Sequence, residues 1–318
     1  MIDRLLSYPV HGLMASLREY IRYAPNDFGK DPLLRTFHIL RRLFFFDTRS
    51  KLTAFPSRKV VVDTVFGAKL ECKVPSDQIS TYLYLFGIWE PHITEWIKSR
   101  LSPGDVFVDV GANLGYYSLL AAQQVGPRGS VVAVEASPSI FKLLERNVQL
   151  NDASNIRCVQ RAVLEKPGTV KIYRGPEYNM GLTTTLTTMS NCSFEAEVQA
   201  GPLGDMLHPD EISRVRLIKV DVEGAEWSVV RGLEPLLPKL RPDAEIVIEI
   251  APLKGAAHGE TPETILSMFR SHGFHFYALE NDYRAGSYLR DMKAPTAPRR
   301  VETVDKQLDL IVTRAELT

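Results

Sequence analysis

The sequence predicts an α/β fold in which a mainly parallel sheet carries helices on both faces. From about residue 104 onward, short runs rich in β-branched residues alternate with amphipathic segments of helical period, a pattern typical of parallel strands joined by helical crossovers. The first such run, residues 106–110, passes through a glycine-rich turn directly into a helical segment. A strand, a tight turn and a helix N-terminus form a small-ligand cradle. We therefore expect the ligand site of this sheet at that turn.

The composition is that of a neutral globular protein. The chain has 318 residues, 45% hydrophobic and 24% charged, with 38 basic and 38 acidic side chains. Proteins that bind nucleic acid usually carry a basic excess, so we expect no nucleic-acid partner. The cysteines Cys72, Cys158 and Cys192 show no CxxC spacing, which predicts neither a disulfide framework nor a zinc site. Thiols of this kind favour a cytoplasmic location.

Residues 1–58 are predicted to form a helical extension. Apolar residues recur at helical spacing over residues 5–21 and 32–46, and the second segment carries Arg35, Arg41 and Arg42. A basic amphipathic helix is compatible with peripheral membrane contact, but such a stripe more often packs on the protein's own core or on a second copy in a homo-oligomer. No apolar run of about 18 residues occurs, so we expect no transmembrane segment, and the N-terminus does not resemble a secretion signal.

A β-hairpin is expected to follow the extension. Residues 59–63 and 69–74 flank a turn that contains Gly67, and apolar and polar residues alternate in the second arm. A helical stretch is expected over residues 79–101, with Trp89 and Pro91 inside it. A Ser-Pro-Gly turn at residues 102–104 precedes the sheet.

Seven strands are expected in the main sheet, with helices between most of them. The strands are predicted at residues 106–110, 130–135, 156–163, 216–221, 245–250, 275–279 and 307–313. The helices are predicted at residues 114–124, 139–150, 226–237 and 262–272, the second of them introduced by Ser137 and Pro138. Two further strands, 168–173 and 194–199, flank a hydroxyl-rich loop at residues 178–185. That loop is either a site for a polyol acceptor or an ordinary surface connection.

The glycine turn argues against a dinucleotide. A dinucleotide fingerprint requires Gly-x-Gly-x-x-Gly, but after Gly111 this chain has Asn113 and Tyr116 at the other two positions. Asp109, just before the turn, places an anion where a pyrophosphate would lie. At the end of the next strand, Glu135 is suited to accept both hydroxyls of a ribose, although a surface carboxylate at a strand end would look the same. The turn therefore favours a cationic, adenosine-containing ligand.

Three segments together resemble the FkbM-type methyltransferases. They are Asp109-Val-Gly-Ala-Asn-Leu-Gly-Tyr-Tyr, Val134-Glu-Ala-Ser-Pro, and Leu217-Ile-Lys-Val-Asp-Val-Glu-Gly-Ala-Glu. The resemblance extends over about residues 59–314. It implies an FkbM-type domain at residues 59–318 with a cofactor core from about residue 104. The implied fold is the class I (Rossmann-like) methyltransferase fold, a sheet of seven strands with the last antiparallel. The implied cofactor is S-adenosylmethionine, and the implied reaction is O-methylation of a glycan or small-molecule natural product.

The resemblance also implies a set of cofactor-binding residues. Gly111, Asn113 and Gly115 would hold the methionine portion, Asp109 its amino group, and Glu135 the ribose. Ala136, Arg161 and Ala162 would flank the adenine. The complete expected set is Asp109, Gly111, Ala112, Asn113, Gly115, Tyr116, Glu135, Ala136, Arg161, Ala162 and Asp221.

Three acids are candidates for catalysis. Asp221, Glu223 and Glu249 follow or end strands at the carboxyl edge of the sheet, where a carboxylate can take the proton of an acceptor hydroxyl. Alternatively, Asp221 only orients the methionine portion. The three acids could gather a divalent cation, but the resemblance requires none and we expect none. Lys219 is expected to pair with Glu249.

Two other functional classes stay open from the sequence. One is an NAD-dependent oxidoreductase on the same doubly wound plan, against which the missing glycines argue. The other is a non-catalytic cofactor-binding scaffold that uses residues 1–58 as its interaction arm. The identity of the acceptor does not follow from the fold.

Overall fold

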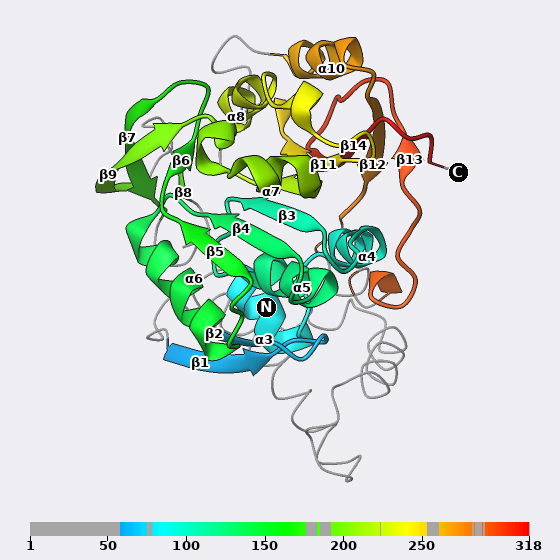
Figure 1. Ribbon diagram of the computed structural model, residues 1–318. Helices are drawn as coiled ribbons and strands as arrows, with labels where there is room; N and C mark the ends of the chain where they lie inside the picture. The colour runs from blue at the N-terminus through cyan, green and yellow to red at the C-terminus, as the bar shows by residue number, and fades with distance from the viewer. Residues whose placement is uncertain are drawn as a thin grey trace, which may run out of the picture.

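The computed structural model describes the chain from residue 58 onward, with a few gaps (Figure 1). The described residues are 58–74, 78–175, 183–184, 192–222, 224–252, 261–281, 283, 288 and 290–317. The helical extension expected over residues 1–58 lies outside them apart from its last residue, as does most of the loop at 178–185. The domain boundary at residue 58 therefore stays a prediction.

The main sheet has eight strands in the order β13-β12-β14-β11-β10-β3-β4-β5. Its parallel members are β3 (Val106–Val110), β4 (Ser130–Val134), β5 (Ile156–Val159), β10 (Val215–Val220) and β11 (Glu245–Ile250). The last strand, β14 (Leu308–Thr313), lies antiparallel between β11 and β12 (His275–Leu279). Strands occur at all seven predicted positions, and the antiparallel last strand is confirmed. The additional edge strand β13 (Arg299–Arg300) was not predicted.

The strand expected over residues 156–163 is wrong as a single element. Only β5 belongs to the main sheet, whereas β6 (Ala162–Val163) belongs to a second sheet of order β6-β9-β7-β8. The other members of this second sheet are β7 (Gly168–Arg174), β8 (Thr183–Thr184) and β9 (Ser193–Gly201), and the sheet stands at one end of the molecule (Figure 1). Because apolar residues continue on both sides of the break, the sequence pattern does not reveal it.

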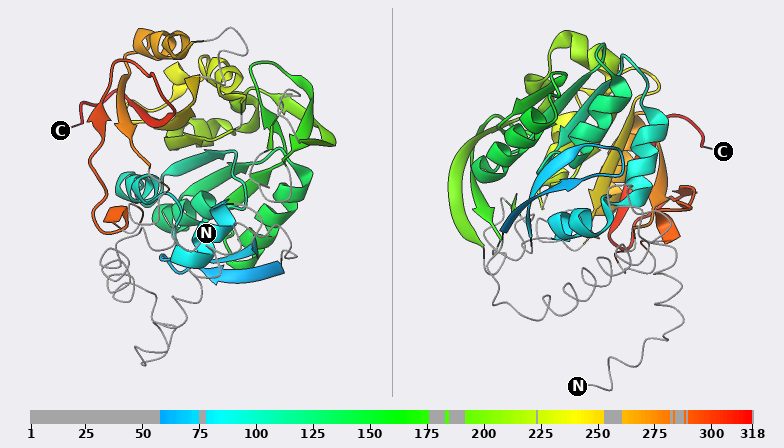
Figure 2. Two further views of the ribbon diagram at one scale, coloured as in Figure 1. Left: turned by 180° about the vertical axis from the view of Figure 1, so that it is seen from behind. Right: turned by 90° about the horizontal axis from the view of Figure 1, so that it is seen from below.

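Two helical layers cover the two faces of the main sheet. One layer contains α4 (Pro91–Arg100), α5 (Tyr116–Val125) and α6 (Pro138–Leu150), and the other contains α7 (Pro209–Arg214), α8 (Glu226–Leu233) and α10 (Pro262–Ser271) (Figures 1 and 2). Alternate residues of β3 pack on opposite faces of the sheet, since Val106 and Val108 belong to one buried cluster and Phe107 to the other. No helix within the described residues is long and apolar enough to cross a membrane.

Two predicted helices end earlier than expected. The stretch 79–101 is two helices, α3 (Gln78–Phe86) and α4, because the backbone turns left-handed at Gly87 and again at Glu90, with φ values of 70° and 40°. Pro91 is then the first residue of α4, a position where its missing N–H costs nothing. Similarly, α8 ends at Leu233, and residues 237–239 form a short 3₁₀ turn that contains Pro238.

The predicted hairpin is present and is bound to α6. Its strands are β1 (Arg58–Asp63) and β2 (Lys69–Val74), and they lie alongside α6 (Figure 2). Asn147 of α6 accepts a hydrogen bond from the Glu71 N–H (2.7 Å) and donates one to the Leu114 carbonyl (2.8 Å). One buried asparagine thus joins the hairpin, α6 and the glycine turn, which holds that turn in place.

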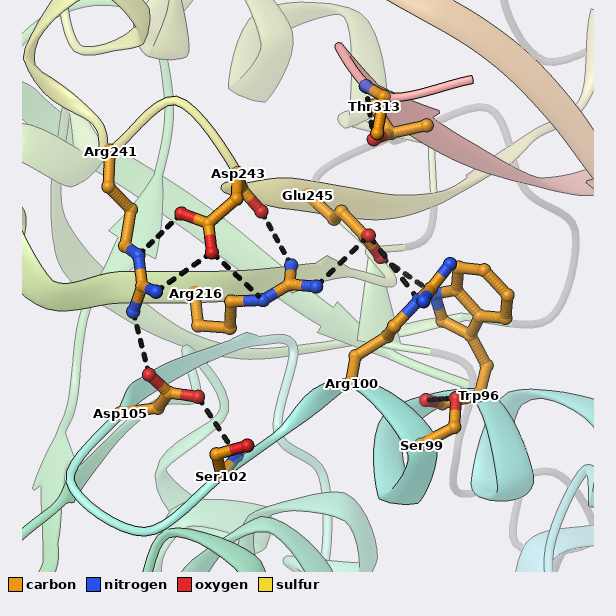
Figure 3. Close-up of polar contacts among 11 residues, drawn as sticks. Trp96, Ser99, Arg100, Ser102, Asp105, Arg216, Arg241, Asp243, Glu245 and Thr313 are labelled. Atoms are coloured by element: carbon orange, nitrogen blue, oxygen red, sulfur yellow. Dashed lines mark hydrogen bonds and ion pairs between the residues drawn. The ribbon is translucent and has the colours of Figure 1, made fainter. Parts of the chain in front are cut away.

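A charge network lies away from the glycine turn, where β10 and β11 begin (Figure 3). The buried carboxylate of Glu245 accepts hydrogen bonds from Trp96 Nε1 (3.1 Å) and Arg216 Nη2 (3.2 Å), and Arg100 Nε lies 3.4 Å away. Because Trp96 and Arg100 belong to α4, the network fastens this helix to the sheet. It therefore also supports the Glu90 segment at the start of α4.

Glu245→Ala is expected to lower the free energy of unfolding. The substitution leaves Arg216 and Arg100 without their shared carboxylate. We expect the free energy of unfolding to fall by about 2–3 kcal/mol, which is less than for a fully buried ion pair because both arginines reach solvent. Urea denaturation measures this cost. The control Glu95→Ala removes an exposed ion pair with Lys98 within α4, and it should lower the free energy of unfolding by less than about 0.5 kcal/mol. Equal costs for the two variants would contradict the structural role of Glu245.

Candidate active site

A cavity of about 270 Å³ opens at the carboxyl edge of the main sheet. Residues at or just beyond the ends of β3, β4, β10 and β11 line it, which is where open α/β sheets bind ligands. One end has mainly apolar walls and the other is polar and acidic. The predicted glycine turn lies between the two ends, so a ligand in this cavity would extend across the turn.

The glycine turn packs directly against the end of β10. Gly111 has a φ of 79°, and a Cβ atom built on it would lie 1.9 Å from the Asp221 carbonyl oxygen. The N–H groups of Gly111 and Ala112 both donate to the Val134 carbonyl, at 2.9 and 3.0 Å. Only glycine fits a position that combines positive φ with so close a backbone approach. The turn is therefore a fixed part of the cavity wall.

Glu135 is a buried carboxylate held by backbone donors. Its Oε2 accepts from the Asn113 N–H (3.0 Å) and its Oε1 from the Ser137 N–H (2.9 Å). Burial raises its pKa to about 7, although the backbone hydrogen bonds act in the opposite direction. Each oxygen keeps a further acceptor position, so a ligand with two adjacent hydroxyls can bind both.

The apolar end of the cavity has the character of a slot for a flat ring. Ile140 of α6, Val163 of β6 and Ile172 of β7 contribute to its walls. Arg161 also lines it; its Nη2 donates to the Ala200 carbonyl (3.4 Å), and its buried Nε has no hydrogen-bond partner among the described residues. An apolar slot that carries one polar donor suits an adenine, which has both stacking faces and acceptor nitrogens.

Lys219, Asp109 and Asp221 form a charged group at the middle of the sheet. Lys219 Nζ donates to Asp221 Oδ2 (2.7 Å), so the predicted pairing with Glu249 is corrected to Asp221. Glu249 Oε1 instead accepts from Gln307 (2.5 Å). Burial opposes the charge of Lys219, but the attraction of Asp221, Asp109 and Glu90 outweighs it and raises the pKa of the ammonium. Lys219 therefore keeps its positive charge.

Asp109 lies behind the turn rather than on the cavity wall. It is 1% exposed, and its Oδ2 accepts from Ser118 Oγ (2.6 Å). Its Oδ1 has no hydrogen-bond partner within the described part of the chain. Burial raises the pKa of this carboxyl, against the attraction of Lys219.

The structure brings most of the predicted residues to one cavity. Those on its wall are Gly111, Asn113, Glu135, Ala136, Arg161, Ala162, Asp221 and Glu249. Those outside its lining are Asp109, Ala112, Gly115 and Tyr116, and the Tyr116 hydroxyl lies 3.1 Å from Thr94 Oγ1 of α4. Glu223 lies outside the described residues. Among the residues that the structure describes, no three His, Cys, Asp or Glu side chains are grouped to hold a metal ion.

Sequence reasoning did not select Glu90, Trp89, Tyr283 and Gln307, all of which line the acidic end. Glu90 is 6% exposed, and burial raises its pKa to about 7 despite the attraction of Lys219. One signal was available for it. An acid directly before Pro91 marks the start of a helix.

The cavity fits S-adenosylmethionine, the cofactor that the sequence resemblance implies. The apolar slot suits its adenine and Glu135 its ribose hydroxyls. The acidic end, with the unsatisfied Asp109 oxygen beneath the turn, suits its positively charged amino-acid end. A pyrophosphate would find carboxylates in place of donors at this end, so the cavity disfavours NAD.

Comparisons with known proteins agree with this fit. A family model described as "Methyltransferase FkbM domain" matches residues 109–276. "Methyltransferase 1" of Beauveria bassiana is 29% identical over 150 residues, 42% of this chain and 60% of that protein. "Methyltransferase sdnD" of Sordaria araneosa is 28% identical over 165 residues, 43% of this chain and 63% of that protein.

A third relative is matched over a longer span. The "31-O-demethyl-FK506 methyltransferase FkbM" of Streptomyces tacrolimicus is 28% identical over 223 residues, 61% of this chain and 82% of that protein. The chain thus spans about three fifths of the length of the first two relatives. The family match itself includes the glycine turn, Glu135, Asp221 and Glu249. The chain belongs to the FkbM family of S-adenosylmethionine-dependent methyltransferases.

Proposed function

We propose that this protein transfers the methyl group of S-adenosylmethionine to a hydroxyl oxygen of a glycan or small-molecule natural product. The observation that carries the proposal is that the two ends of the cavity differ in chemical character. One end is an apolar slot suited to an adenosine, and the other carries the hydrogen-bonding side chains of Asp221, Glu249 and Gln307. The name of the Streptomyces tacrolimicus relative, which denotes methylation of an oxygen in that protein's substrate, supports transfer to oxygen.

The chain's own residues would act by positioning and by taking up a proton. Bound S-adenosylmethionine supplies an electrophilic methyl group. Walls of the cavity would hold the acceptor oxygen in line with it, which is the main source of rate in such a displacement. Asp221 is 37% exposed and is oriented by Lys219, which supports it as the group that would accept the hydroxyl proton. Glu249 and Glu223 stay alternative acceptors, Glu223 outside the described residues.

Transfer of a labelled methyl group tests the proposed activity. The purified chain is incubated with methyl-labelled S-adenosylmethionine and fractionated small-molecule and glycan extracts. A labelled product whose methyl group is on oxygen is expected. Binding of the cofactor with no labelled product in any fraction would favour the scaffold alternative, and binding of NAD in its place would favour the oxidoreductase.

Asp221→Asn is expected to reduce turnover more than cofactor affinity. The amide keeps the size of the side chain but cannot take up the proton, and loss of general-base assistance costs roughly 10²–10⁴-fold in rate. Rates with the acceptor found above, together with calorimetry of cofactor binding, separate the two effects. An Asp221→Asn enzyme with unchanged turnover would transfer the role to Glu249 or Glu223.

The cellular location of the protein is a further part of this proposal. We place it in the cytoplasm, which is supported by the three cysteines, all among the described residues, since none of them forms a disulfide. Peripheral membrane contact and homo-oligomerisation through residues 1–58 stay predictions that lie outside the described residues.

A further inference from the structure

Glu90 occupies an unusual position in the cavity wall. It precedes α4 with φ 40° and ψ 79°, a left-handed conformation that non-glycine residues rarely adopt. Its side chain is buried and lines the acidic end of the cavity. A strained backbone that carries a buried acid into a cavity persists only where the surroundings enforce it, and such positions cluster at ligand sites.

Tyrosines from two other parts of the chain fix the Glu90 carboxylate. Tyr117 of α5 donates to its Oε2 (2.6 Å), and Tyr283 donates to its Oε1 (2.5 Å). The Glu90 N–H donates to the Tyr288 hydroxyl (2.9 Å). Burial raises the pKa of Tyr117, Tyr283 and Tyr288, so these hydroxyls keep their protons and can donate. The carboxylate is thus held in one orientation with an acceptor position left on each oxygen.

The charges around Glu90 do not balance. The single ammonium of Lys219 interacts with three carboxylates, those of Asp221, Asp109 and Glu90, and it lies 4.6 Å from the centre of the Tyr117 ring. Asp221 already holds this ammonium at 2.7 Å. Because Asp109 and Glu90 are buried, an excess of negative charge here is stable only if a second cation enters or if protons neutralise the acids.

Other titratable groups also surround Glu90, and they do not supply that cation. Asp309 of β14 lies near it, and burial together with the charges of Glu90 and Glu249 raises its pKa, which favours its neutral form. The groups that face Glu90 or its neighbours are Asp109 of β3, Tyr116 and Tyr117 of α5, Lys219 and Asp221 of β10 and its end, Asp309 of β14, and Tyr283 and Tyr288 near the C-terminus. Lys219 is the single cation among them.

We propose that Glu90 is a cofactor-binding residue whose carboxylate pairs with the ammonium of the methionine portion, so that the cofactor binds the ionised form of Glu90. This inference rests on the proposed function, which assigns the cavity to S-adenosylmethionine. The ammonium lies at the far end of the cofactor from its adenine, as Glu90 lies at the far end of the cavity from the apolar slot. Pairing with the ammonium compensates the negative charge of Glu90 itself and expels the proton from its carboxyl group.

The expected pH dependence follows from the pKa values of the unliganded protein. Glu90 and Glu135 each have a pKa of about 7, and the cofactor requires both in ionised form. Affinity is therefore full only well above pH 7, and it falls as the pH decreases through 7. By linkage, each group should reduce the affinity about eightfold between pH 7.5 and pH 6, and the two together about 70-fold.

Two ligands separate the contributions of the two acids. S-Adenosylhomocysteine carries the ammonium and the ribose, whereas 5′-methylthioadenosine carries the ribose without the amino-acid end. Calorimetry at pH 6.5 in buffers of different ionisation enthalpy counts the protons released. About 1.5 protons are expected for S-adenosylhomocysteine and about 0.8 for 5′-methylthioadenosine. This comparison uses the unmodified protein, so it does not depend on whether a variant folds.

Glu90→Gln supplies the second measurement. The variant should bind S-adenosylhomocysteine about tenfold to a hundredfold more weakly at pH 7.5, the usual effect of losing a charged hydrogen-bond partner. It should release about 0.8 protons and bind 5′-methylthioadenosine as the unmodified protein does. Glu95→Gln, which lies on the same helix outside the cavity lining, should leave every value unchanged.

Three outcomes would overturn the inference. Equal proton release by the two ligands would exclude the role of Glu90 while leaving the cofactor assignment intact, as would unchanged S-adenosylhomocysteine affinity in Glu90→Gln. Failure of both ligands to bind the unmodified protein would overturn the proposed function together with this inference.

Discussion

Gly111→Ala is expected to abolish cofactor binding and to destabilise the fold. The added Cβ would lie 1.9 Å from the Asp221 carbonyl oxygen, and that oxygen belongs to the backbone, which cannot rotate away. The left-handed conformation of the residue adds about 1–2 kcal/mol, and forced displacement of packed backbone typically adds about 1–3 kcal/mol. The turn must therefore move, and the Asn113 N–H that holds Glu135 must move with it.

The matched control for Gly111→Ala is Gly67→Ala in the hairpin turn. Gly67 has a similar φ of 84°, but nothing lies within 4 Å of its added Cβ, so its substitution carries only the conformational cost. Urea denaturation and calorimetry with S-adenosylhomocysteine measure both variants. We expect cofactor affinity to fall more than about a hundredfold in Gly111→Ala, a loss of nearly 3 kcal/mol, and to stay unchanged in Gly67→Ala. Normal affinity in Gly111→Ala would show that the cofactor does not contact this turn.

Glu135→Ala is expected to weaken cofactor binding by about two orders of magnitude. Hydrogen bonds to a charged group contribute about 1.5–3 kcal/mol, and the carboxylate is placed to accept both ribose hydroxyls. The substitution also leaves the N–H groups of Asn113 and Ser137 without their acceptor, so the turn loses part of its support. Calorimetry with S-adenosylhomocysteine and with 5′-methylthioadenosine should show the loss for both, because both carry the ribose.

Glu195→Ala is the control for Glu135→Ala. Glu195 of β9 accepts from Ser137 Oγ (2.8 Å) and from the Ser139 N–H (3.1 Å), so it contacts the same segment without lining the cavity. Its loss should reduce stability by about 1 kcal/mol, as for other helix N-terminal acceptors, and should change cofactor affinity less than threefold. If Glu135→Ala behaved like Glu195→Ala, Glu135 would be a support of α6 and not a ribose ligand.

The elements that the sequence predicted well are those whose burial is uniform along their length. The runs 106–110 and 245–250 are buried along all or nearly all of their length, and they are β3 and β11 with the predicted bounds. The glycine turn and Glu135 were also predictable, because a positive-φ turn and an acid after the next strand are local features of the chain.

The errors occurred where neighbouring segments look alike but pack on different partners. Residues 156–159 and 162–163 form one strand-like stretch in the sequence, yet they pair with β4 and β9 respectively. Likewise, the helical period continues across residues 87–90, where two left-handed residues separate α3 from α4. Periodicity reports burial and not the partner that provides it.

The sequence by itself determined the fold class, the family and the part of the cofactor site that Glu135 and the glycine turn form, because these depend on residues that are close along the chain. Only the tertiary structure decided which charges meet. Lys219 pairs with Asp221 rather than with Glu249. Glu90 is distant in sequence from both, and Tyr117, which donates to Glu90 and whose ring lies against Lys219, connects it to them. A buried charge interacts with whatever the fold brings within a few ångströms, and that proximity is not encoded in the spacing of residues along one strand or helix.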